Sequence, residues 1–418
     1  MLVGAPDRAT SRDLADDHLL ELGRLTDTAG GTVVGTLVQR LEAPNPRFYL
    51  GEGKARELRD LVQARSADLI VFDEELSPAQ GKNLEELIGV RVMDRSELIL
   101  DIFATRARSK EARMQVELAQ LEYLLPRLRR MWSHLSRIRG GIGLRGPGET
   151  QLETDRRLIG VRIRDLKRKL EDVAKARAVQ RRSREGSYRV ALVGYTNAGK
   201  SSLLRALSGS ELFVEDRLFA TLDSATRSVD LGSGYEALLT DTVGFIRKLP
   251  HHLVASFRST LEEAAEADVL LHVVDASHPD WEEQKQIVEE VLSDLGLANH
   301  DKILVFNKID RMTSSDVDSL RDRVRAFEGT PAVFLAAHRP ESLEALRETL
   351  RTRVRGRLAQ VVLSIPAEDG EAIATVYREG EVMSRSDESL TVSLTARVPH
   401  GVLGRLTGRR GVIVQEAV

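Results

Sequence analysis

The sequence contains no cysteine among its 418 residues. This absence excludes disulfide bonds, a thiolate nucleophile and any zinc or iron–sulfur site with cysteine ligands. A run of about 18 apolar residues is also missing, so we expect no transmembrane helix. The N-terminal segment lacks the basic start and the apolar core of a secretory signal. We therefore expect a cytoplasmic protein without a membrane anchor.

The length of the chain exceeds that of one ordinary domain. Hydrophobic residues make up 42 % and charged residues 30 % of the sequence, as in soluble globular proteins. Changes in pattern divide the chain into four regions. We predict an N-terminal α/β domain over residues 1–106, a basic helical hairpin over 107–186, a P-loop domain with a parallel sheet over 187–356, and a small α+β domain over 357–418.

In the first region, β-branched stretches such as DLIVF alternate with segments of helical spacing. Ser77 is a candidate N-cap, because Pro78 follows it at the first helical position. Strand–helix alternation predicts a mainly parallel sheet. The segment GEGK, Gly51 to Lys54, resembles a phosphate loop but lacks the second half. We interpret it as a turn, and a second nucleotide site in this domain stays an open alternative.

The second region concentrates positive charge. From Thr105 to Glu185 there are 22 Lys and Arg residues against 10 Asp and Glu, whereas the whole chain has a net charge of −3. Two amphipathic helices joined by a glycine-rich segment predict a hairpin with packed apolar faces and outward arginines, and Pro126 predicts a kink. Such a block is typical of polyanion-binding elements, although a merely solvated helical surface is the alternative.

The predicted hairpin tip contains GIGLRG, Gly141 to Gly146, which matches the dinucleotide pattern GxGxxG by its letters. It follows an arginine-rich helix instead of a strand, so the dinucleotide interpretation fails its structural requirement. A glycine-rich tip can enter a narrow RNA cavity and approach unstacked bases. We predict RNA contacts from Arg137, Arg139 and Arg145.

A phosphate-binding loop is the most specific pattern in the chain. The apolar run YRVALV leads into GYTNAGKS, and a helical pattern follows, as the motif GxxxxGK[ST] requires. Backbone N–H groups and the helix dipole would face the phosphates. Lys200 would contact the β- and γ-phosphates, and the Ser201 hydroxyl suits Mg²⁺. The predicted nucleotide contacts are Gly194, Tyr195, Thr196, Asn197, Ala198, Gly199, Lys200 and Ser201.

Two further motifs follow at the ends of predicted strands. In the first, Asp241 can hold Mg²⁺ through water and Gly244 can offer its N–H to a γ-phosphate. In the second, the Asp310 carboxylate can accept hydrogen bonds from guanine N1–H and N2–H₂, two donors that adenine lacks. The order of the motifs therefore predicts a GTPase. The residues concerned are Asp241, Thr242, Val243, Gly244, Asn307, Lys308, Ile309 and Asp310.

A last guanine-contacting loop is expected near residue 336. GTPases usually carry Ser-Ala-Lys there, and this chain has Ala336, Ala337 and His338. Backbone contact with guanine O6 can survive this change. We expect the absent serine to leave the loop without its usual support and the nucleotide affinity modest.

Three residues bear on hydrolysis. A threonine that completes the Mg²⁺ shell in the presence of γ-phosphate is expected before the DTVG motif, and spacing does not choose between Thr221 and Thr226. Phe245 stands where Ras-like enzymes carry the glutamine that orients water, so we expect slow hydrolysis by the chain alone. Asn197 occupies a P-loop position at which some GTPases hold a potassium ion.

The chain resembles the HflX family of ribosome-associated translational-control GTPases from about Leu14 to Leu350. The resemblance rests on SPAQGKNLE, DRSELILDIFATRARSKEARMQVELAQLEYLLPRL and GGIGLRGPGETQLETDRR, together with GYTNAGKS, FATLD, DTVG and NKID. It implies binding to the large ribosomal subunit and the splitting or rescue of stalled ribosomes under stress. It favours Thr221 as the switch threonine. Further nucleotide contacts implied are Phe219, Ala220, Thr221, Leu222 and Asp223.

We therefore expect a monomeric GTP-hydrolysing switch that uses Mg²⁺ and K⁺, binds GTP and GDP, and is stimulated by the large ribosomal subunit and its RNA. A non-ribosomal RNA remodeller is the first alternative. It would need aromatic stacking platforms, and the basic block has only Tyr123 and Trp132. A membrane-associated scaffold GTPase is the second, and the sequence shows no lipidation motif for it.

Overall fold

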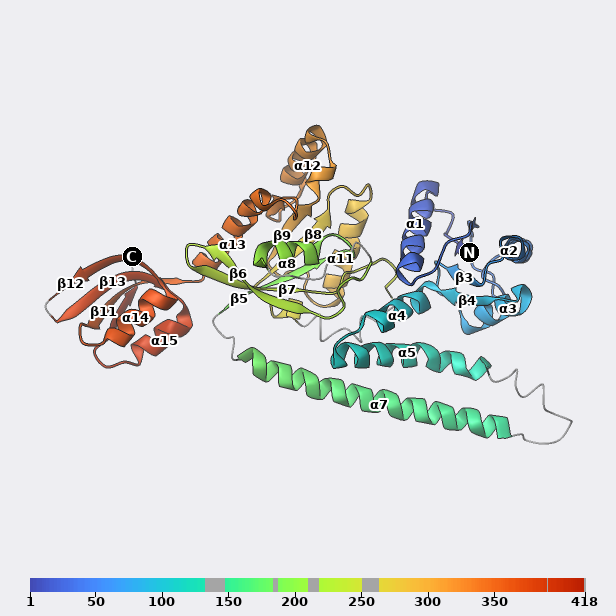
Figure 1. Ribbon diagram of the computed structural model, residues 1–418, viewed down its shortest axis with the longest axis horizontal. Coiled ribbons are helices and arrows are strands. Elements are labelled where there is room, and N and C mark those ends of the chain that lie inside the picture. Colours follow the sequence, from blue (N-terminus) through green and yellow to red (C-terminus); the bar gives the residue numbers. More distant parts are fainter. Residues whose placement is uncertain (132–146, 183–186, 210–217, 250–262, 389, 417–418) are drawn as a thin grey trace. The chain divides into compact units, whose positions relative to one another are not determined.

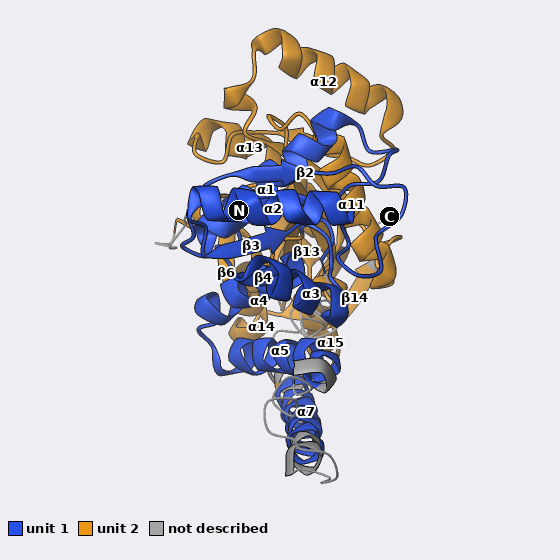
Figure 2. Cartoon of the chain, turned by 90° about the vertical axis from the view of Figure 1, so that its right-hand side faces the viewer, with its two compact units in different colours: residues 1–175, 215–223, 246–261 blue, residues 176–214, 224–245, 262–418 orange. Residues whose placement is uncertain are grey.

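The computed structural model describes residues 1–131, 147–182, 187–209, 218–249, 263–388 and 390–416. Internal contacts divide the chain into two compact units (Figure 2). Two short segments from the middle of the sequence belong to the first unit, apart from their neighbours along the chain. The first unit comprises residues 1–175, 215–223 and 246–261, and the second comprises 176–214, 224–245 and 262–418.

A four-stranded parallel sheet forms the centre of the first unit, in the order β2-β1-β3-β4. Strands β3 and β4 are labelled in Figure 1. Helices α2 and α3 pack on one face through a shared apolar core, and α1 and α4 contact the strands and each other. The α/β fold predicted for this region is confirmed. The elements are β1 (Leu2–Gly4), α1 (Arg12–Thr28), β2 (Thr36–Val38), α2 (Glu52–Arg65), β3 (Leu69–Phe72), α3 (Pro78–Ile88), β4 (Arg91–Asp94) and α4 (Arg95–Arg106).

Local sequence explains two helix starts in this unit. The Ser77 hydroxyl accepts a hydrogen bond from the backbone N of Gln80, whose side chain accepts from Ser77 N in return, with Pro78 in the first turn. The interpretation of GEGK as a turn is wrong. Gly51 is the N-cap of α2, so most of the segment is the first turn of a helix.

Two long helices form the predicted hairpin, α5 (Lys110–Met131) and α7 (Pro147–Arg182). Met114 and Leu118 of α5 pack against Leu166 of α7, which confirms the predicted contact of the apolar faces. Leu158 of α7 is exposed and takes no part in this contact. Pro126 lies within α5. Even these longest of the described helices lack the apolar character that a membrane crossing requires.

A six-stranded sheet forms the centre of the second unit, in the order β10-β9-β8-β5-β7-β6. The prediction of a parallel sheet is wrong at one edge, because β6 runs antiparallel to β7. Ser233 and Gly234 join the two strands with φ of 56° and 79°, the conformation of a tight hairpin turn. The strands are β5 (Tyr188–Gly194), β6 (Ala225–Gly232), β7 (Tyr235–Asp241), β8 (Val269–Asp275), β9 (Lys302–Asn307) and β10 (Ala332–Phe334).

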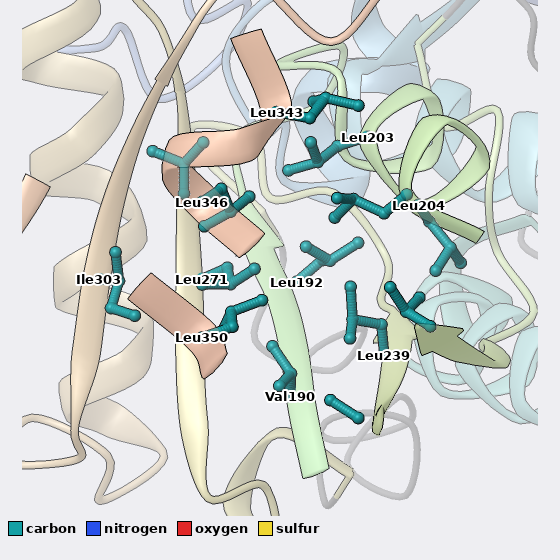
Figure 3. Packing of buried hydrophobic residues seen from close by; sticks show 14 of the residues in the cluster. Val190, Leu192, Leu203, Leu204, Leu239, Leu271, Ile303, Leu343, Leu346 and Leu350 are labelled. Carbon is teal, nitrogen blue, oxygen red and sulfur yellow. The ribbon is translucent and has the colours of Figure 1, made fainter. Parts of the chain in front are cut away.

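Leucine-rich helices cover both faces of this sheet. Leu203 and Leu204 of α8 and Leu346 and Leu350 of α13 pack against the strand residues on one face (Figure 3). Trp281 and residues of α12 belong to a second cluster that includes the other side of β8 and β9. The helices are α8 (Lys200–Ser208), α11 (Trp281–Asp294), α12 (Ser314–Phe327) and α13 (Glu344–Gly356), with short 3₁₀ turns η1 (Ile309–Arg311) and η2 (Pro340–Leu343).

The C-terminal region, red in Figure 1, has a separate four-stranded antiparallel sheet in the order β12-β13-β11-β14. Alternate residues of β11 and β13 are buried with α14 and α15, so this sheet has its own core. The α+β prediction is confirmed. The elements are β11 (Ala359–Pro366), α14 (Gly370–Glu379), β12 (Glu381–Asp387), β13 (Thr391–Val398), α15 (His400–Thr407) and β14 (Ile413–Glu416).

Candidate nucleotide-binding site

The loop between β5 and α8 has the backbone of a phosphate-binding loop. Gly199 has a φ of 100°, and a Cβ there would lie 2.2 Å from Nδ2 of Asn307. Only glycine fits this position, because a side chain would meet both a strained backbone and a fixed neighbour. Asn197 also has a positive φ, of 60°. Helix α8 begins at Lys200, so its N-terminal N–H groups follow directly on the loop.

Lys200 is almost fully buried beneath this loop. Its Nζ donates to the carbonyl oxygens of Gly194 at 3.0 Å and Tyr195 at 2.9 Å. Burial lowers the pKa of Lys200 to about 8, and the nearby charge of Asp241 opposes that shift. A buried ammonium group held by neutral carbonyls gains from any anion that reaches it, so the loop suits phosphate.

Ser201 and Asp241 bring together two oxygen ligands for a metal. The Ser201 hydroxyl donates to Oδ2 of Asp241 at 2.5 Å, where α8 begins and β7 ends. Carboxylate and hydroxyl oxygens are ligands that Mg²⁺ accepts, and Mg²⁺ usually adds phosphate oxygens and water to so small a protein set. The pair therefore fits Mg²⁺. Thr242 has a structural role instead, since its buried hydroxyl donates to the carbonyl of Leu192 at 2.6 Å.

The chain after Asp241 lies directly on the phosphate-binding loop. Phe245 N donates to the carbonyl of Gly194 at 3.1 Å, and Thr196 N donates to the carbonyl of Phe245 at 2.6 Å. A Cβ on Gly244 would lie 2.7 Å from Cα of Thr196, so a side chain there would force the segment away from the loop. The Phe245 ring is buried, and an apolar ring cannot orient water.

Asn307 joins the phosphate end of the site to its base end. Its Nδ2 donates to the carbonyl of Ala198 at 2.9 Å, and its Oδ1 accepts from the N–H of Ala337 at 3.0 Å. Lys308 adds a second link, because its Nζ donates to the carbonyl of Asn197 at 2.8 Å and to Asp275 Oδ2 at 2.7 Å. The sequence analysis missed Asp275, although it ends the buried strand VLLHVVD.

Asp310 has the arrangement expected of a base-reading carboxylate. Its Oδ1 is buried and has no hydrogen-bond partner among the residues that the structure describes. Its Oδ2 lies 3.7 Å from Nε2 of His338. A buried carboxylate oxygen without a donor is costly, so a ligand with N–H groups at this position gains affinity.

The loop at Ala336 is supported by a residue that sequence analysis missed. Ser342 Oγ accepts from the N–H of Ala336 at 3.1 Å and lies 2.7 Å from the carbonyl of the same residue, to which it can donate. The expectation that the absent serine leaves this loop unsupported is therefore wrong. Ser342 follows six residues later, outside the motif, so no spacing rule identifies it.

Residues Phe219–Asp223 belong to the first unit. The Phe219 ring is buried against Phe103, with centroids 4.7 Å apart in an edge-to-face arrangement. The Asp223 carboxylate accepts from the backbone N–H groups of Arg108 and Ser109, each at 3.1 Å. The segment is thus fixed at both ends, with Ala220, Thr221 and Leu222 between them.

The chain after Phe245 is also held in the first unit. Arg247 donates to Asp73 at 3.1 Å, Lys248 donates to it at 2.7 Å, and Arg95 donates at 3.0 Å. Burial alone would raise the pKa of Asp73, but these three cations hold it well below its usual range. Nothing in the local sequence around Asp73 predicts this cluster.

The structure bears unequally on the remaining predicted residues. Thr226 lies in β6, where its hydroxyl is 2.9 Å from that of Thr240, so it is part of the sheet edge. Thr221 lies outside the helices and strands, and its role stays a prediction. Arg137, Arg139 and Arg145 lie outside the described residues.

Comparison with known families covers most of the chain. Residues 16–104 match the family model described as GTP-binding GTPase N-terminal, and residues 106–184 match GTP-binding GTPase Middle Region. Residues 189–308 match the model described as 50S ribosome-binding GTPase. The GTPase HflX of Magnetococcus marinus is 44 % identical over 427 residues, covering 98 % of each chain. This chain belongs to the HflX family of GTPases.

Two further HflX proteins and one solved structure are similar to this chain. The GTPase HflX of Caldanaerobacter subterraneus is 45 % identical over 94 % of this chain and 90 % of its own length. That of Escherichia coli is 43 % identical over 93 % and 91 %. A GTP-binding protein from Sulfolobus solfataricus in complex with GDP matches 85 % of this chain and 99 % of its own, with 24 % identity and a TM-score of 0.44. The sequence matches alone establish this HflX-family chain as a GTP hydrolase.

Proposed function

We propose that this HflX-family GTPase binds the large ribosomal subunit in its GTP-bound form and splits or rescues stalled ribosomes under stress. The match of residues 189–308 to a 50S ribosome-binding GTPase model supports the partner. The observation that carries the nucleotide part is Asp310, whose buried Oδ1 has no donor among the described residues. Asn307, three residues earlier, is bonded to Ala198 of the P-loop. Guanine supplies the missing N–H groups.

Each site residue then has a role. The backbone N–H groups from Gly194 to Ser201 and the Lys200 ammonium bind the phosphates. Gly244 donates its N–H to the γ-phosphate. Ser201 and Thr221 would hold Mg²⁺ directly and Asp241 through water, and the ion would neutralise phosphate charge. Because Thr221 and Gly244 would contact the γ-phosphate side alone, loss of that phosphate would remove their contacts with the nucleotide.

Hydrolysis by the isolated chain should be slow, since Phe245 cannot orient the attacking water. We propose that the large subunit accelerates it by ordering the loops around Thr221 and Gly244 and excluding bulk water. A partner that only orders loops adds no charge, so we expect about 10–10²-fold. A potassium ion held by Asn197 would supply further positive charge at the phosphates.

The basic hairpin is the proposed ribosomal RNA contact. Exposed arginines on α7 include Arg156, Arg157 and Arg164, and the predicted tip arginines Arg137, Arg139 and Arg145 lie between its helices in the sequence. The RNA-remodeller alternative is disfavoured by Tyr123, whose buried hydroxyl donates to Asp94 at 3.0 Å, so its ring cannot serve as a stacking platform. Trp132 lies outside the described residues.

Co-sedimentation tests the partner. With a non-hydrolysable GTP analogue the chain should pellet with large subunits, and with GDP it should stay in solution. Lys200→Ala should abolish the difference, because the nucleotide no longer binds. Replacing Arg137, Arg139 and Arg145 with Glu should weaken pelleting and flatten its salt dependence while GTP affinity is kept. Equal pelleting by parent and triple variant across a salt titration would disprove the hairpin contact.

Single-turnover GTP cleavage tests the mechanism. Large subunits should raise the rate, and potassium should raise it more than sodium. Thr221→Ala should keep GDP binding but lose the response to subunits, because its hydroxyl acts only with γ-phosphate and Mg²⁺. When the parent chain and GTP are added to intact ribosomes, light scattering should fall, because the subunits separate. A fast rate without ribosomes, unchanged by either addition, would contradict this mechanism.

A further inference from the structure

We propose that His338 tunes the guanine affinity of this site, because its charged imidazole competes with guanine for the Asp310 carboxylate. The proposal rests on the assignment of Asp310 as the guanine-reading residue. His338 occupies the position where GTPases usually carry lysine in this loop, so it adds a titratable group to a contact that is otherwise insensitive to pH near neutrality.

The geometry places the imidazole of His338 beside Oδ2 of the Asp310 carboxylate. His338 Nε2 lies 3.7 Å from Asp310 Oδ2, beyond a hydrogen bond but within reach of a small side-chain rotation. The imidazole is 63 % exposed and the Asp310 side chain 15 %. The backbone before His338 is fixed by Asn307 and Ser342, so rotation of the side chain alone can make or break the contact.

Guanine needs both oxygens of Asp310, one for N1–H and one for N2–H₂. Oδ1 has no partner among the described residues and is open to a ligand, whereas Oδ2 faces His338. An imidazolium ion is a charged donor and pairs with a carboxylate more strongly than neutral imidazole does. Guanine therefore displaces a stronger partner at low pH than at high pH, and its affinity falls on acidification.

The other charged groups around the pair do not supply this effect. Lys308 is engaged by Asp275 and by the carbonyl of Asn197. Arg311, next to Asp310, is exposed, as are Arg339 and Glu341 after His338. Carboxylate and guanidinium groups of ordinary environment keep their charge between pH 5.5 and 7.5, the range in which histidine titrates. Burial lowers the pKa of Lys200 to about 8, and its titration is common to the parent and the His338 variants.

The test is the dissociation constant of a fluorescent GDP analogue at pH 7.5 and pH 5.5 for the parent chain and His338→Gln. Titration of the phosphate groups of the GDP analogue affects both proteins equally, so its contribution cancels in the comparison. An exposed ion pair contributes little, so on acidification the parent should lose roughly 1.4- to five-fold more affinity than the variant does, which corresponds to about 0.2–1 kcal/mol. His300→Gln, at a half-buried histidine before β9, should behave like the parent.

Equal pH dependence in the parent and His338→Gln would overturn the proposal. His338→Asn serves as a second variant if the glutamine variant fails to fold. Asp310→Asn separates this failure from that of the underlying assignment. If this variant loses GDP affinity at both pH values while the histidine variants match the parent, only the role of His338 is wrong. If Asp310→Asn binds GDP like the parent, the guanine assignment itself is wrong.

Discussion

Both units contain parallel strands with acidic residues just beyond their carboxyl ends, but these carboxylates have different partners. Asp73 follows β3 in the first unit and is bound by Arg95, Arg247 and Lys248. Asp310 follows β9 in the second unit, and its buried Oδ1 has no protein donor in the part of the chain that the structure describes. An acidic residue at a strand end is therefore a ligand site only where the protein itself leaves the carboxylate unneutralised.

The difference follows from the cost of burying charge. A buried carboxylate without compensation is expensive, so it must be neutralised by the protein or by a ligand. The chain neutralises Asp73 with residues far apart in sequence, and the result is structural. At Asp310 the proposed guanine contact would supply the donors, and the result would be recognition. Substitutions at the two positions should therefore affect different measurements.

The largest effect is expected from Asp73→Ala. Removing this carboxylate leaves the buried guanidinium groups of Arg95 and Arg247 to share the carboxylate of Glu21. Loss of one carboxylate from a buried cluster of ion pairs costs about 3–5 kcal/mol of unfolding free energy. Denaturant unfolding at pH 7 measures it. Asp68→Ala is the matched control at an exposed position just before β3, where a change within about 0.5 kcal/mol is expected. Similar stability of the two variants would remove the structural role of Asp73.

Asp310→Asn should show the opposite behaviour, with stability kept and recognition changed. Losing a hydrogen bond to a charged group costs about 1.5–3 kcal/mol, so GDP affinity should fall roughly 10- to 150-fold. Xanthine nucleotides should bind better, because the amide then faces xanthine O2. Fluorescence titration with GDP and XDP measures both. A variant with weakened folding and unchanged base preference would place Asp310 in the same class as Asp73.

His272 extends the comparison, because it is neither paired by the described residues nor part of the proposed ligand site. This histidine in β8 is buried, and its ring nitrogens have no hydrogen-bond partner among the described residues. Burial lowers its pKa to about 3, and the charges of Lys285, Lys302 and Lys200 add to the shift. Below about pH 6.5 the His272 side chain binds a proton in the unfolded chain but not in the folded protein. The free energy of unfolding therefore falls as pH falls, by up to about 1.4 kcal/mol per pH unit.

His272→Leu should remove this acid sensitivity while keeping the volume of the core. Denaturant unfolding at pH 7 and pH 5 measures it, with His300→Gln as the control at a half-buried site. Stability that falls equally between these pH values in the parent and the leucine variant would mean that other groups cause the loss.

The smallest effect is expected in the hairpin, where charge pairs face solvent. Lys167 Nζ lies 2.8 Å from Glu122 Oε1 across α7 and α5, and the lysine side chain is 54 % exposed. Glu122→Gln should cost about 0.2–1 kcal/mol, because water already screens the pair. The cost should vanish at about 1 M salt, where the screening length is near 3 Å. A cost that persists at high salt would mean that this pair is buried in solution.

The local parts of the molecule were predictable from sequence. The Gly199 conformation, the Ser77 cap and the helical periodicity of α5 and α7 depend on neighbours a few residues away, so sequence patterns record them. The Ser233–Gly234 pair is a comparable local indication of a hairpin turn. It predicts the antiparallel edge strand that the prediction of a parallel sheet missed.

The long-range parts were not predictable in this way. Asp73 and Arg247 are separated by 174 residues, and no periodicity relates them. Ser342 replaces the support of a motif serine from outside the motif, because any hydroxyl that reaches the Ala336 backbone can serve. His338 was named as a departure from the usual lysine, but its proximity to Asp310 required the folded loop.

Asn307 has a consequence for how a nucleotide is held. By bonding to Ala198 and Ala337 at once, it keeps the phosphate loop and the base loop at one spacing. A nucleoside and a diphosphate then behave as two tethered ligands, each raising the effective concentration of the other. Guanosine alone or pyrophosphate alone should therefore bind far more weakly than GDP, in which the two parts are covalently joined. The site therefore selects its ligand by the distance between base and phosphates as well as by the identity of the base.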